Sequence, residues 1–228
     1  MIVKILQRQT IYEDNLYIEF DLLGQTLEYK AGQFFSLTLL NPPFTDQRGN
    51  SRFFGFVNSP TEVKKAAMVT KIGVSAFKKS LMALSVSAQV QIDSVGGHTV
   101  LPSDINQKVV LIAGGIGIAP FMSILRFIKE KSLPYEISLI YVNKDRETAV
   151  FLDEIESYSK ENKLFKFFPV FSETKTINPD LIKDNLSELS NKIYYITGEQ
   201  TFVIQVFKLL KELGVEAKNI SMEIFTGY

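Results

Sequence analysis

The chain has 228 residues, enough for one large domain or two ordinary ones. Basic residues (Lys and Arg) and acidic residues (Asp and Glu) each number 25, so the net charge is zero. This balance argues against nucleic acid or an anionic membrane as the main partner. There is no cysteine, which excludes disulfides, a cysteine nucleophile, thiolate zinc sites and a cysteine-ligated iron–sulfur cluster within these residues.

The remaining composition favours an ordinary globular protein. Residues 1–15 have neither a long apolar core nor a small-residue cleavage site, so we expect no signal peptide. No stretch is apolar enough to cross a bilayer, so we expect no membrane insertion and a cytoplasmic protein. We also expect no metal site.

The first hundred residues predict many short strands joined by turns. Asparagine and proline lie between the strands, as in residues 41–43, and favour turns. Close spacing of so many strands indicates an antiparallel barrel or a sandwich. One helix is expected after Ser75, with Phe77, Leu81 and Leu84 along one face. The predicted strands cover residues 2–7, 16–22, 34–40, 53–57, 67–72 and 90–94.

The pattern changes near residues 101–103, where strands begin to alternate with helices. Repeated β–α units with right-handed crossovers predict a doubly wound parallel sheet. We therefore expect two domains, residues 1–102 and 103–228. The predicted strands are 109–113, 137–142, 165–171, 193–197 and 220–225, and the predicted helices are 120–131, 149–159, 178–186 and 201–213.

A glycine turn follows the first strand of the second half. The unbroken apolar run 109–113 is typical of a strand buried on both faces. Gly114, Gly115 and Gly117 follow, and Pro120 then indicates the first turn of a helix. The N–H groups and dipole of that helix favour an anion such as a pyrophosphate. Pro120 stands where the dinucleotide fingerprint has its third glycine, and a turn that binds nothing is the alternative.

Other polar residues end the neighbouring strands. Ligands of doubly wound sheets bind beyond the carboxyl ends of the strands. Asn143 ends one predicted strand, and Thr197 and Gly198 end another. We therefore expect these residues to lie near the glycine turn.

Residues 52–60, RFFGFVNSP, resemble the flavin-binding signature of the ferredoxin–NADP reductase superfamily, Arg-x-Tyr-Ser followed by a short strand and Ser-Pro. The resemblance implies that Arg52 binds flavin phosphate and that Phe54 stacks on the isoalloxazine ring. It also assigns Phe53 and Gly55 to the cofactor site, with only the backbone N–H of Gly55 available to flavin N5. The alternative is a surface arginine followed by a core pair of phenylalanines.

A second stretch, residues 71–81, resembles the Gly-x-Ser helix start of the same superfamily. This resemblance implies that Lys71, Gly73, Val74 and Ser75 surround the diphosphate of the flavin, with backbone N–H groups directed at it. An ordinary N-capped helix is the alternative. His98, the sole histidine, is given no catalytic role.

The last residues, SMEIFTGY, resemble the end of superfamily members, where an acidic residue is followed two positions later by an aromatic that covers the flavin. Glu223 and Phe225 match this spacing. We predict that Glu223 orients nicotinamide or relays a proton, with a solvent-facing carboxylate as the alternative. Tyr228, in the short extension, is expected to reach the adenine of FAD. The alternative for Phe225 and Tyr228 is a last strand with a frayed tail.

The resemblance implies an N-terminal antiparallel β-barrel that binds flavin and a C-terminal α/β domain that binds NADH or NADPH. Asn143 stands where an acid usually pairs with the ribose diol of NADH, and Lys144 and Arg146 follow it. These cations either receive the 2′-phosphate of NADPH or are solvated loop charges. We therefore predict that both nucleotides are accepted without strong preference.

The function predicted from these motifs is that of an NAD(P)H-dependent flavoprotein oxidoreductase. Hydride passes from nicotinamide to bound FAD, with FMN as the less favoured flavin, and electrons leave for an unidentified protein or small-molecule acceptor. One alternative is a non-catalytic flavin-binding electron-transfer subunit of a larger redox complex. Another is a degenerate fold that holds no flavin.

Overall fold

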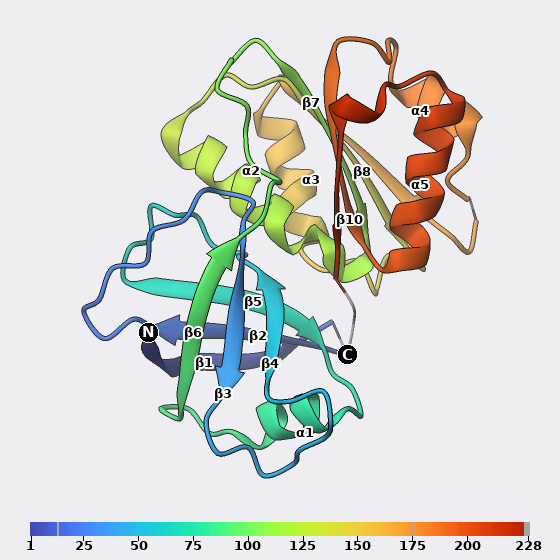
Figure 1. The fold of residues 1–228 in the computed structure, drawn as a ribbon. Coiled ribbons are helices and arrows are strands. Elements are labelled where there is room, and N and C mark those ends of the chain that lie inside the picture. The colour runs from blue at the N-terminus through green and yellow to red at the C-terminus, as the bar shows by residue number, and fades with distance from the viewer. Residues whose placement is uncertain (13, 175, 226–228) are drawn as a thin grey trace. The chain divides into compact units, whose positions relative to one another are not determined.

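The computed structural model describes residues 1–12, 14–174 and 176–225, so Tyr228 lies outside the described residues (Figure 1). The chain forms two compact units. The first contains residues 1–100 together with 119–127, and the second contains residues 101–118 and 128–225. The elements of the first half are β1 (Ile2–Ile11), β2 (Asn15–Asp21), β3 (Phe34–Leu39), β4 (Ser51–Gly55), β5 (Lys65–Lys71), α1 (Ala76–Ala83) and β6 (Gln89–Gly96).

The elements of the second half alternate between strand and helix, as predicted. They are β7 (Lys108–Gly114), a short 3₁₀ helix (Gly115–Ile118), α2 (Ala119–Lys131), β8 (Ile137–Asn143), α3 (Leu152–Glu161), β9 (Phe165–Phe171), α4 (Pro179–Asn185), β10 (Lys192–Gly198), α5 (Gln200–Glu212), a second 3₁₀ helix (Ala217–Asn219) and β11 (Ile220–Ile224). No helix in the described part of the chain is both long enough and apolar enough to cross a membrane.

The first unit is an antiparallel sheet that closes on itself. Its six strands have the order β4-β3-β6-β1-β2-β5. The two edge strands meet where the N–H of Val57, just after β4, donates to the carbonyl of Ala67 on β5 at 2.9 Å. The side chain of Asn58 extends this closure, since its Oδ1 accepts from the N–H of Ala67 and its Nδ2 donates to the carbonyl of Lys65. A barrel is therefore formed, because closure satisfies the polar groups of both edges.

Alternation along the strands fills the barrel. On β2, Leu16, Ile18 and Phe20 are buried while the residues between them are partly exposed. Helix α1 starts at the predicted cap, where Ser75 Oγ accepts from the N–H of Lys78 at 3.4 Å. Phe77 and Leu81 of α1 are buried in the same core as the strand residues. Leu84 is the C-cap rather than part of the helical face that we expected.

The second unit is a five-stranded parallel sheet with the order β11-β10-β7-β8-β9. Figure 1 shows α3 on one side of this sheet and α4 with α5 on the other. Residues 109–113 of β7 are all buried, as their unbroken apolar run predicted. The chain runs outward from β7 to β9 and then returns to β10 on the other side of β7. The carboxyl ends of β7 and β10 therefore form the point where ligands of doubly wound sheets bind.

Helix α3 begins three residues later than predicted. A turn at residues 145–149 precedes it, in which Asp145 Oδ1 accepts from the N–H of Thr148 at 2.8 Å. Phe151 then has a left-handed backbone with φ of 63°, and regular helix starts at Leu152. The local side-chain bond thus competes with helix formation over these residues.

Candidate cofactor-binding residues

The glycine turn and the end of β10 are joined in the second unit. Ala113 on β7 pairs with Thr197 on β10, so the two strands end side by side. Thr197 Oγ1 donates to the carbonyl of Gly117 at 2.6 Å, and this bond is buried. The prediction that Thr197 and Gly198 lie beside the glycine turn is therefore confirmed by the register of the sheet.

The three glycines of the turn are needed for different reasons. A Cβ on Gly117 would lie 2.6 Å from the carbonyl oxygen of Thr197 and 2.7 Å from the backbone of Gly198. A Cβ on Gly114 would lie 2.7 Å from the ring of Phe202. Gly115 has φ of +52°, and a Cβ there would meet nothing within 4 Å. Gly114 and Gly117 therefore allow close packing, while Gly115 allows the left-handed backbone and leaves open space for a ligand.

Asn143 ends β8 and has an unsatisfied donor. Its side chain is only 6% exposed, and its Nδ2 is buried without a hydrogen-bond partner among the described residues. Leaving such a donor unpaired costs about 1–3 kcal/mol. A ligand oxygen at this strand end would satisfy it, which fits the predicted binding of ribose.

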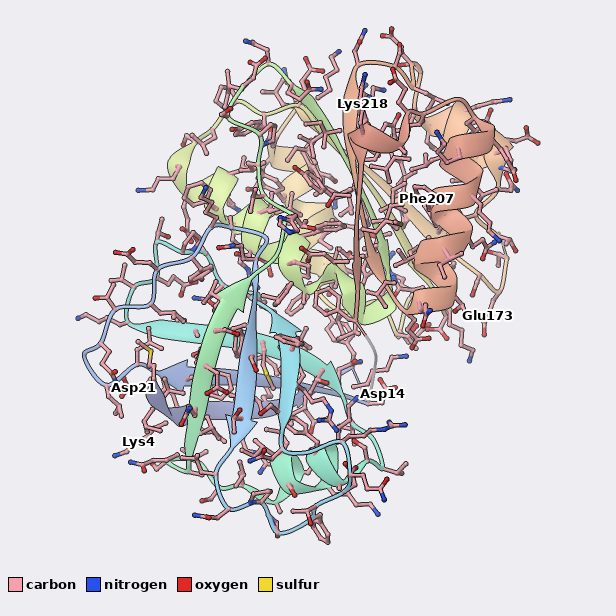
Figure 2. The ribbon with its side chains drawn as sticks, viewed as in Figure 1. Lys4, Asp14, Asp21, Glu173, Phe207 and Lys218 are labelled. Carbon is pink, nitrogen blue, oxygen red and sulfur yellow. The ribbon has the colours of Figure 1, made fainter. Side chains whose placement is uncertain are left out.

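The two cations after Asn143 are held by carboxylates. Lys144 Nζ lies 3.4 Å from Glu173 Oε1, and Figure 2 labels Glu173 just beyond β9. The guanidinium of Arg146 donates two hydrogen bonds to Glu156, both of 2.8 Å. The bond to Glu156 raises the pKa of Arg146, and the same bond lowers the pKa of the Glu156 carboxyl. Both cations are exposed, as the alternative of solvated loop charges predicted, and both have carboxylate partners.

Glu223 is buried in the last strand. It pairs with Thr197 across β10 and β11, and its side chain is 8% exposed. Burial, followed by the charge of Glu223, raises the pKa of Tyr195 on the neighbouring strand. The alternative of a solvent-facing carboxylate is excluded. Phe225 lies one residue past β11, and its N–H donates to the carbonyl of Gly198 at 3.0 Å, so the chain is held here rather than frayed.

In the first unit, one of the two terminal nitrogens of the Arg52 guanidinium forms hydrogen bonds. Its Nη1 donates to the carbonyls of Arg48, Gly49 and Ser51 at 3.0, 3.2 and 2.7 Å. Its Nη2 is buried without a hydrogen-bond partner among the residues that the structure describes, and Asp46 Oδ1 lies 3.9 Å away. The guanidinium therefore has a donor left for an anion, as a phosphate-binding arginine requires.

The two phenylalanines after Arg52 point to opposite sides of the strand. Phe54 is 7% exposed and packs against Phe35 and Phe77, with ring centroids 6.4 and 5.9 Å away. Phe53 is 60% exposed and touches Phe34 edge-on at 5.3 Å. The structure thus places the ring predicted to stack on flavin in the barrel core, and it is Phe53 that has an open face. The alternative placed both phenylalanines in the core, and this is true of Phe54 but not of Phe53.

Gly55 and Pro120 pack against each other within the first unit. A Cβ on Gly55 would lie 2.7 Å from Cδ of Pro120. The serine of the superfamily signature would not fit here without a shift of backbone, so the glycine is explained by packing. Both residues were expected at the cofactor, and the structure shows a structural contact between them.

The segment Gly73–Ser75 precedes α1 as an extended turn. Val74 is highly exposed and Lys71 is exposed at the end of β5, so neither has a role in the core. Lys78 is buried, and its side chain lies against Gly73, where a Cβ would come within 2.9 Å of Lys78 Cδ.

Three comparisons with known proteins agree with this geometry. Residues 111–207 match the family model described as oxidoreductase NAD-binding domain. The chain is 28% identical over 219 residues to Flavohemoprotein A of Dictyostelium discoideum, covering 86% of this chain and 52% of that protein, so it spans about half of that relative. It is 25% identical to a probable flavin reductase of Aliivibrio fischeri, covering 92% of this chain and 89% of the reductase. A variant of the ferredoxin–NADP+ reductase of Plasmodium falciparum has the same fold, with a TM-score of 0.80, 19% identity and coverage of 98% and 96%.

Residues 111–207 are therefore similar to oxidoreductase NAD-binding domains. The barrel followed by a doubly wound sheet, which the sequence predicted, is also the fold of the Plasmodium falciparum reductase. Arg52 Nη2 is buried without a hydrogen-bond partner among the described residues, and this donor fits the predicted flavin phosphate.

One candidate cofactor-binding residue was not predicted from the sequence. Lys78 follows the Gly-x-Ser turn by three positions and brings a buried cation to it. The signal available in the sequence was a lysine in the first turn of a short helix, directly after Phe77. In the structure, the ring of Phe77 lies 5.2 Å from the guanidinium carbon of Arg52.

Proposed function

We propose that the protein is an NAD(P)H-dependent flavoprotein oxidoreductase, with residues 1–102 as the flavin domain and 103–228 as the nucleotide domain. The observation that carries this proposal is the glycine turn at the switch point of the parallel sheet, between the ends of β7 and β10. The unpaired donor of Arg52 in the barrel supports the second cofactor. Bound FAD would supply the ability to accept a hydride and to release electrons singly or in pairs.

The residues of the barrel would hold the flavin. Arg52 Nη2 donates to a phosphate oxygen, and the backbone of Gly73, Val74 and Ser75 contributes N–H groups at the start of α1. Lys78 adds a second positive charge at the same turn. Phe53, whose ring is exposed, contributes apolar surface for the flavin ring.

The residues of the parallel sheet would hold the pyridine nucleotide. The open turn at Gly115 admits the pyrophosphate, and Asn143 Nδ2 donates to the ribose. Glu223 has its carboxylate at the end of β11, beside Thr197, where it accepts a hydrogen bond from the nicotinamide amide. We assign FAD rather than FMN on the basis of the aromatic C-terminal extension, whose Tyr228 lies outside the described residues.

We infer a preference for NADH over NADPH from the charges after β8. Lys144 and Arg146 already have carboxylate partners. The two cations are paired with four carboxylates, those of Asp145, Asp153, Glu156 and Glu173. A dianionic 2′-phosphate at this position would be repelled by the excess of carboxylates. These contacts change the expectation of equal acceptance that was based on the two cations alone.

The electron acceptor is proposed to lie outside residues 1–228. The described residues contain no cluster of His, Cys, Asp or Glu able to hold a metal ion, and the sequence has no cysteine for an iron–sulfur centre. Known relatives include a reductase component of propane 2-monooxygenase from Gordonia and the probable flavin reductase of Aliivibrio. We therefore propose either an oxygenase-type protein partner or a small molecule such as free flavin as the acceptor.

The experiment that tests the function combines flavin identification with rapid kinetics. The purified protein is heated, the released flavin is identified, and the reconstituted protein is mixed anaerobically with NADH or NADPH in a stopped-flow instrument. Bleaching of the flavin absorbance by either nucleotide without a partner protein supports the enzyme. Failure to bind any flavin supports the degenerate fold, and bound flavin that neither nucleotide reduces supports the electron-transfer subunit.

A further inference from the structure

A group of lysines lies at the amino-terminal edge of the parallel sheet, opposite to the edge with the glycine turn. The register places Lys192 on β10 beside Lys108 on β7. Val110, two residues after Lys108, pairs with Ser138 on β8, and Ser138 pairs with Lys166 on β9. Because side chains two residues apart leave the same face of a strand, these four polar residues share one face of the sheet.

The same side chains line a small cavity. Its volume is about 60 Å³, and its polar lining residues are Lys108, Glu136, Ser138, Lys166, Ser187 and Lys192. Ser187 comes from the loop between α4 and β10, which covers this face of the sheet at its edge. A cavity of this volume holds a few water molecules, or one small polyatomic ion in their place.

Lys192 is the residue that makes this cavity unusual. Its side chain is only 9% exposed, but its Nζ is not a buried atom and reaches solvent at the cavity. Burial, together with the nearby charges of Lys108 and Lys166, lowers the pKa of Lys192. An ammonium beside two other cations is unfavourable unless a negative charge accompanies them.

The carboxylates of the region do not supply that charge. Glu136 lines the cavity, but it forms an ion pair with Lys108 at 3.0 Å. Glu188 acts on Lys192 through its charge and does not line the cavity. Three lysines therefore face one carboxylate that is already engaged, and the lining keeps an excess of positive charge.

We propose that this cavity is a binding site for a small tetrahedral oxyanion of the phosphate type, either free or as the terminal group of a phosphate monoester. Lys192, Lys108 and Lys166 contribute positive charge, and the hydroxyls of Ser138 and Ser187 donate hydrogen bonds. Lysine binds phosphate as a point charge with three donors, which suits a site without planar geometry. The site is separate from the proposed nucleotide site, because the amino and carboxyl ends of the strands are opposite edges of the sheet.

The test titrates the full-length protein with inorganic phosphate and follows the ³¹P line width and the melting temperature, with chloride at equal ionic strength as the reference. Saturable broadening and a higher melting temperature are expected, since a ligand of the native state stabilises it. Lys192→Met should weaken phosphate binding about tenfold or more, given the strength of hydrogen bonds to charged groups. Lys131→Met, an exposed lysine in the same unit, is the control and should leave the affinity unchanged.

A second variant and a second ligand extend the test. Lys166→Gln alters an exposed side chain that leaves the fold intact, so it should weaken phosphate binding even where Lys192→Met folds poorly. Phenyl phosphate in place of inorganic phosphate identifies the source: binding of both indicates a monoester, and binding of inorganic phosphate alone indicates the free anion. Three results would overturn the proposal. They are displacement of phosphate by NADH, phosphate binding by Lys166→Gln as tight as by the native protein, and no saturable phosphate binding by the native protein. These results are independent of whether the protein oxidises NADH.

Discussion

Arg52 shows how one side chain both organises a loop and keeps a donor for a ligand. Three carbonyls of the loop before β4 accept from its Nη1, so the guanidinium is fixed before any flavin binds. Its Nη2 remains buried without a hydrogen-bond partner among the described residues, with Asp46 Oδ1 3.9 Å away. Such an orphaned donor is costly in a folded protein, which is why it indicates a binding site.

We predict that Arg52→Ala weakens flavin binding. The variant loses a charge-assisted contact worth about 1.5–3 kcal/mol, so flavin should dissociate on dilution from a protein that remains folded. Retained flavin is measured by absorbance after gel filtration, with thermal unfolding as the check on the fold. Lys30→Ala, which removes an exposed lysine of the same unit, is the control. Full flavin occupancy in Arg52→Ala after dilution would remove Arg52 from the site.

The proposed preference for NADH rests on the charges of single residues. Glu156 holds Arg146 through two hydrogen bonds, so Glu156→Gln should release the guanidinium for a 2′-phosphate and remove one repelling charge. The ratio of reduction efficiencies for NADH over NADPH should fall by about tenfold, as expected for roughly 1.4 kcal/mol of altered charge interaction. Glu154→Gln, on the same helix, is the control. Equal efficiencies of flavin reduction by NADH and NADPH in the native protein would contradict the inferred preference.

At the scale of elements, the turn after β7 and the end of β10 behave as one structure. Thr197 donates to Gly117, and the backbone of residues 197 and 198 occupies the space that a Gly117 side chain would need. The ring of Phe202, at the start of α5, packs on Gly114 in the same way. The loop expected to receive the pyrophosphate is therefore held rigidly by the neighbouring strand and helix.

We predict that Thr197→Val loosens this structure. Valine has nearly the same shape but leaves the buried carbonyl of Gly117 without a donor, at a cost of about 1–3 kcal/mol in the free energy of unfolding. The affinity for the nucleotide should fall as well, because the turn loses its fixed position. Thr201→Val, an exposed threonine in the first turn of α5, is the control and should change the unfolding midpoint in urea much less. Equal midpoints for the two variants would show that the Thr197 bond contributes nothing.

At the scale of the whole molecule, the two units carry different chemistry. The barrel contains the arginine and the helix start proposed for the flavin, and the parallel sheet contains the turn proposed for the nucleotide. In the proposed function each cofactor is bound by a different unit, and the last strand contributes to the nucleotide site. Glu223 and Phe225 belong to that strand and its end.

We predict that Phe225→Ser strengthens nucleotide binding. By the resemblance stated above, the ring of Phe225 covers the flavin and must leave before nicotinamide enters. Removing it should lower the apparent Kd for NAD+ by about two- to tenfold, because the stack contributes roughly 0.5–1.5 kcal/mol. The variant should show a charge-transfer absorption band with NAD+, and its reduced flavin should react faster with oxygen. Met222→Ser, an exposed residue of the same strand, is the control. Unchanged Kd and oxygen reactivity would show that the end of the chain is only a strand end.

The sequence determined the elements and their order, because the signals involved are local. The apolar run 109–113 predicted a strand buried on both faces, and Ser75 predicted the start of α1; both are confirmed. The glycine turn and the two-domain fold were also predicted, since glycines and a few motif residues carry that information in a short stretch. The contacts of the predicted residues with flavin and nucleotide remain predictions.

Tertiary structure decided what depends on neighbours distant in the chain. Phe53 and Phe54 are alike in sequence, and only the pleat of β4 within the closed barrel puts one outside and the other in the core. The need for glycine at Gly55 arises from Pro120, more than sixty positions away. The lysines of the oxyanion cavity come from three strands, and no local pattern brings them together. The physical reason is that burial, packing and charge depend on the register between strands, which only the assembled sheet defines.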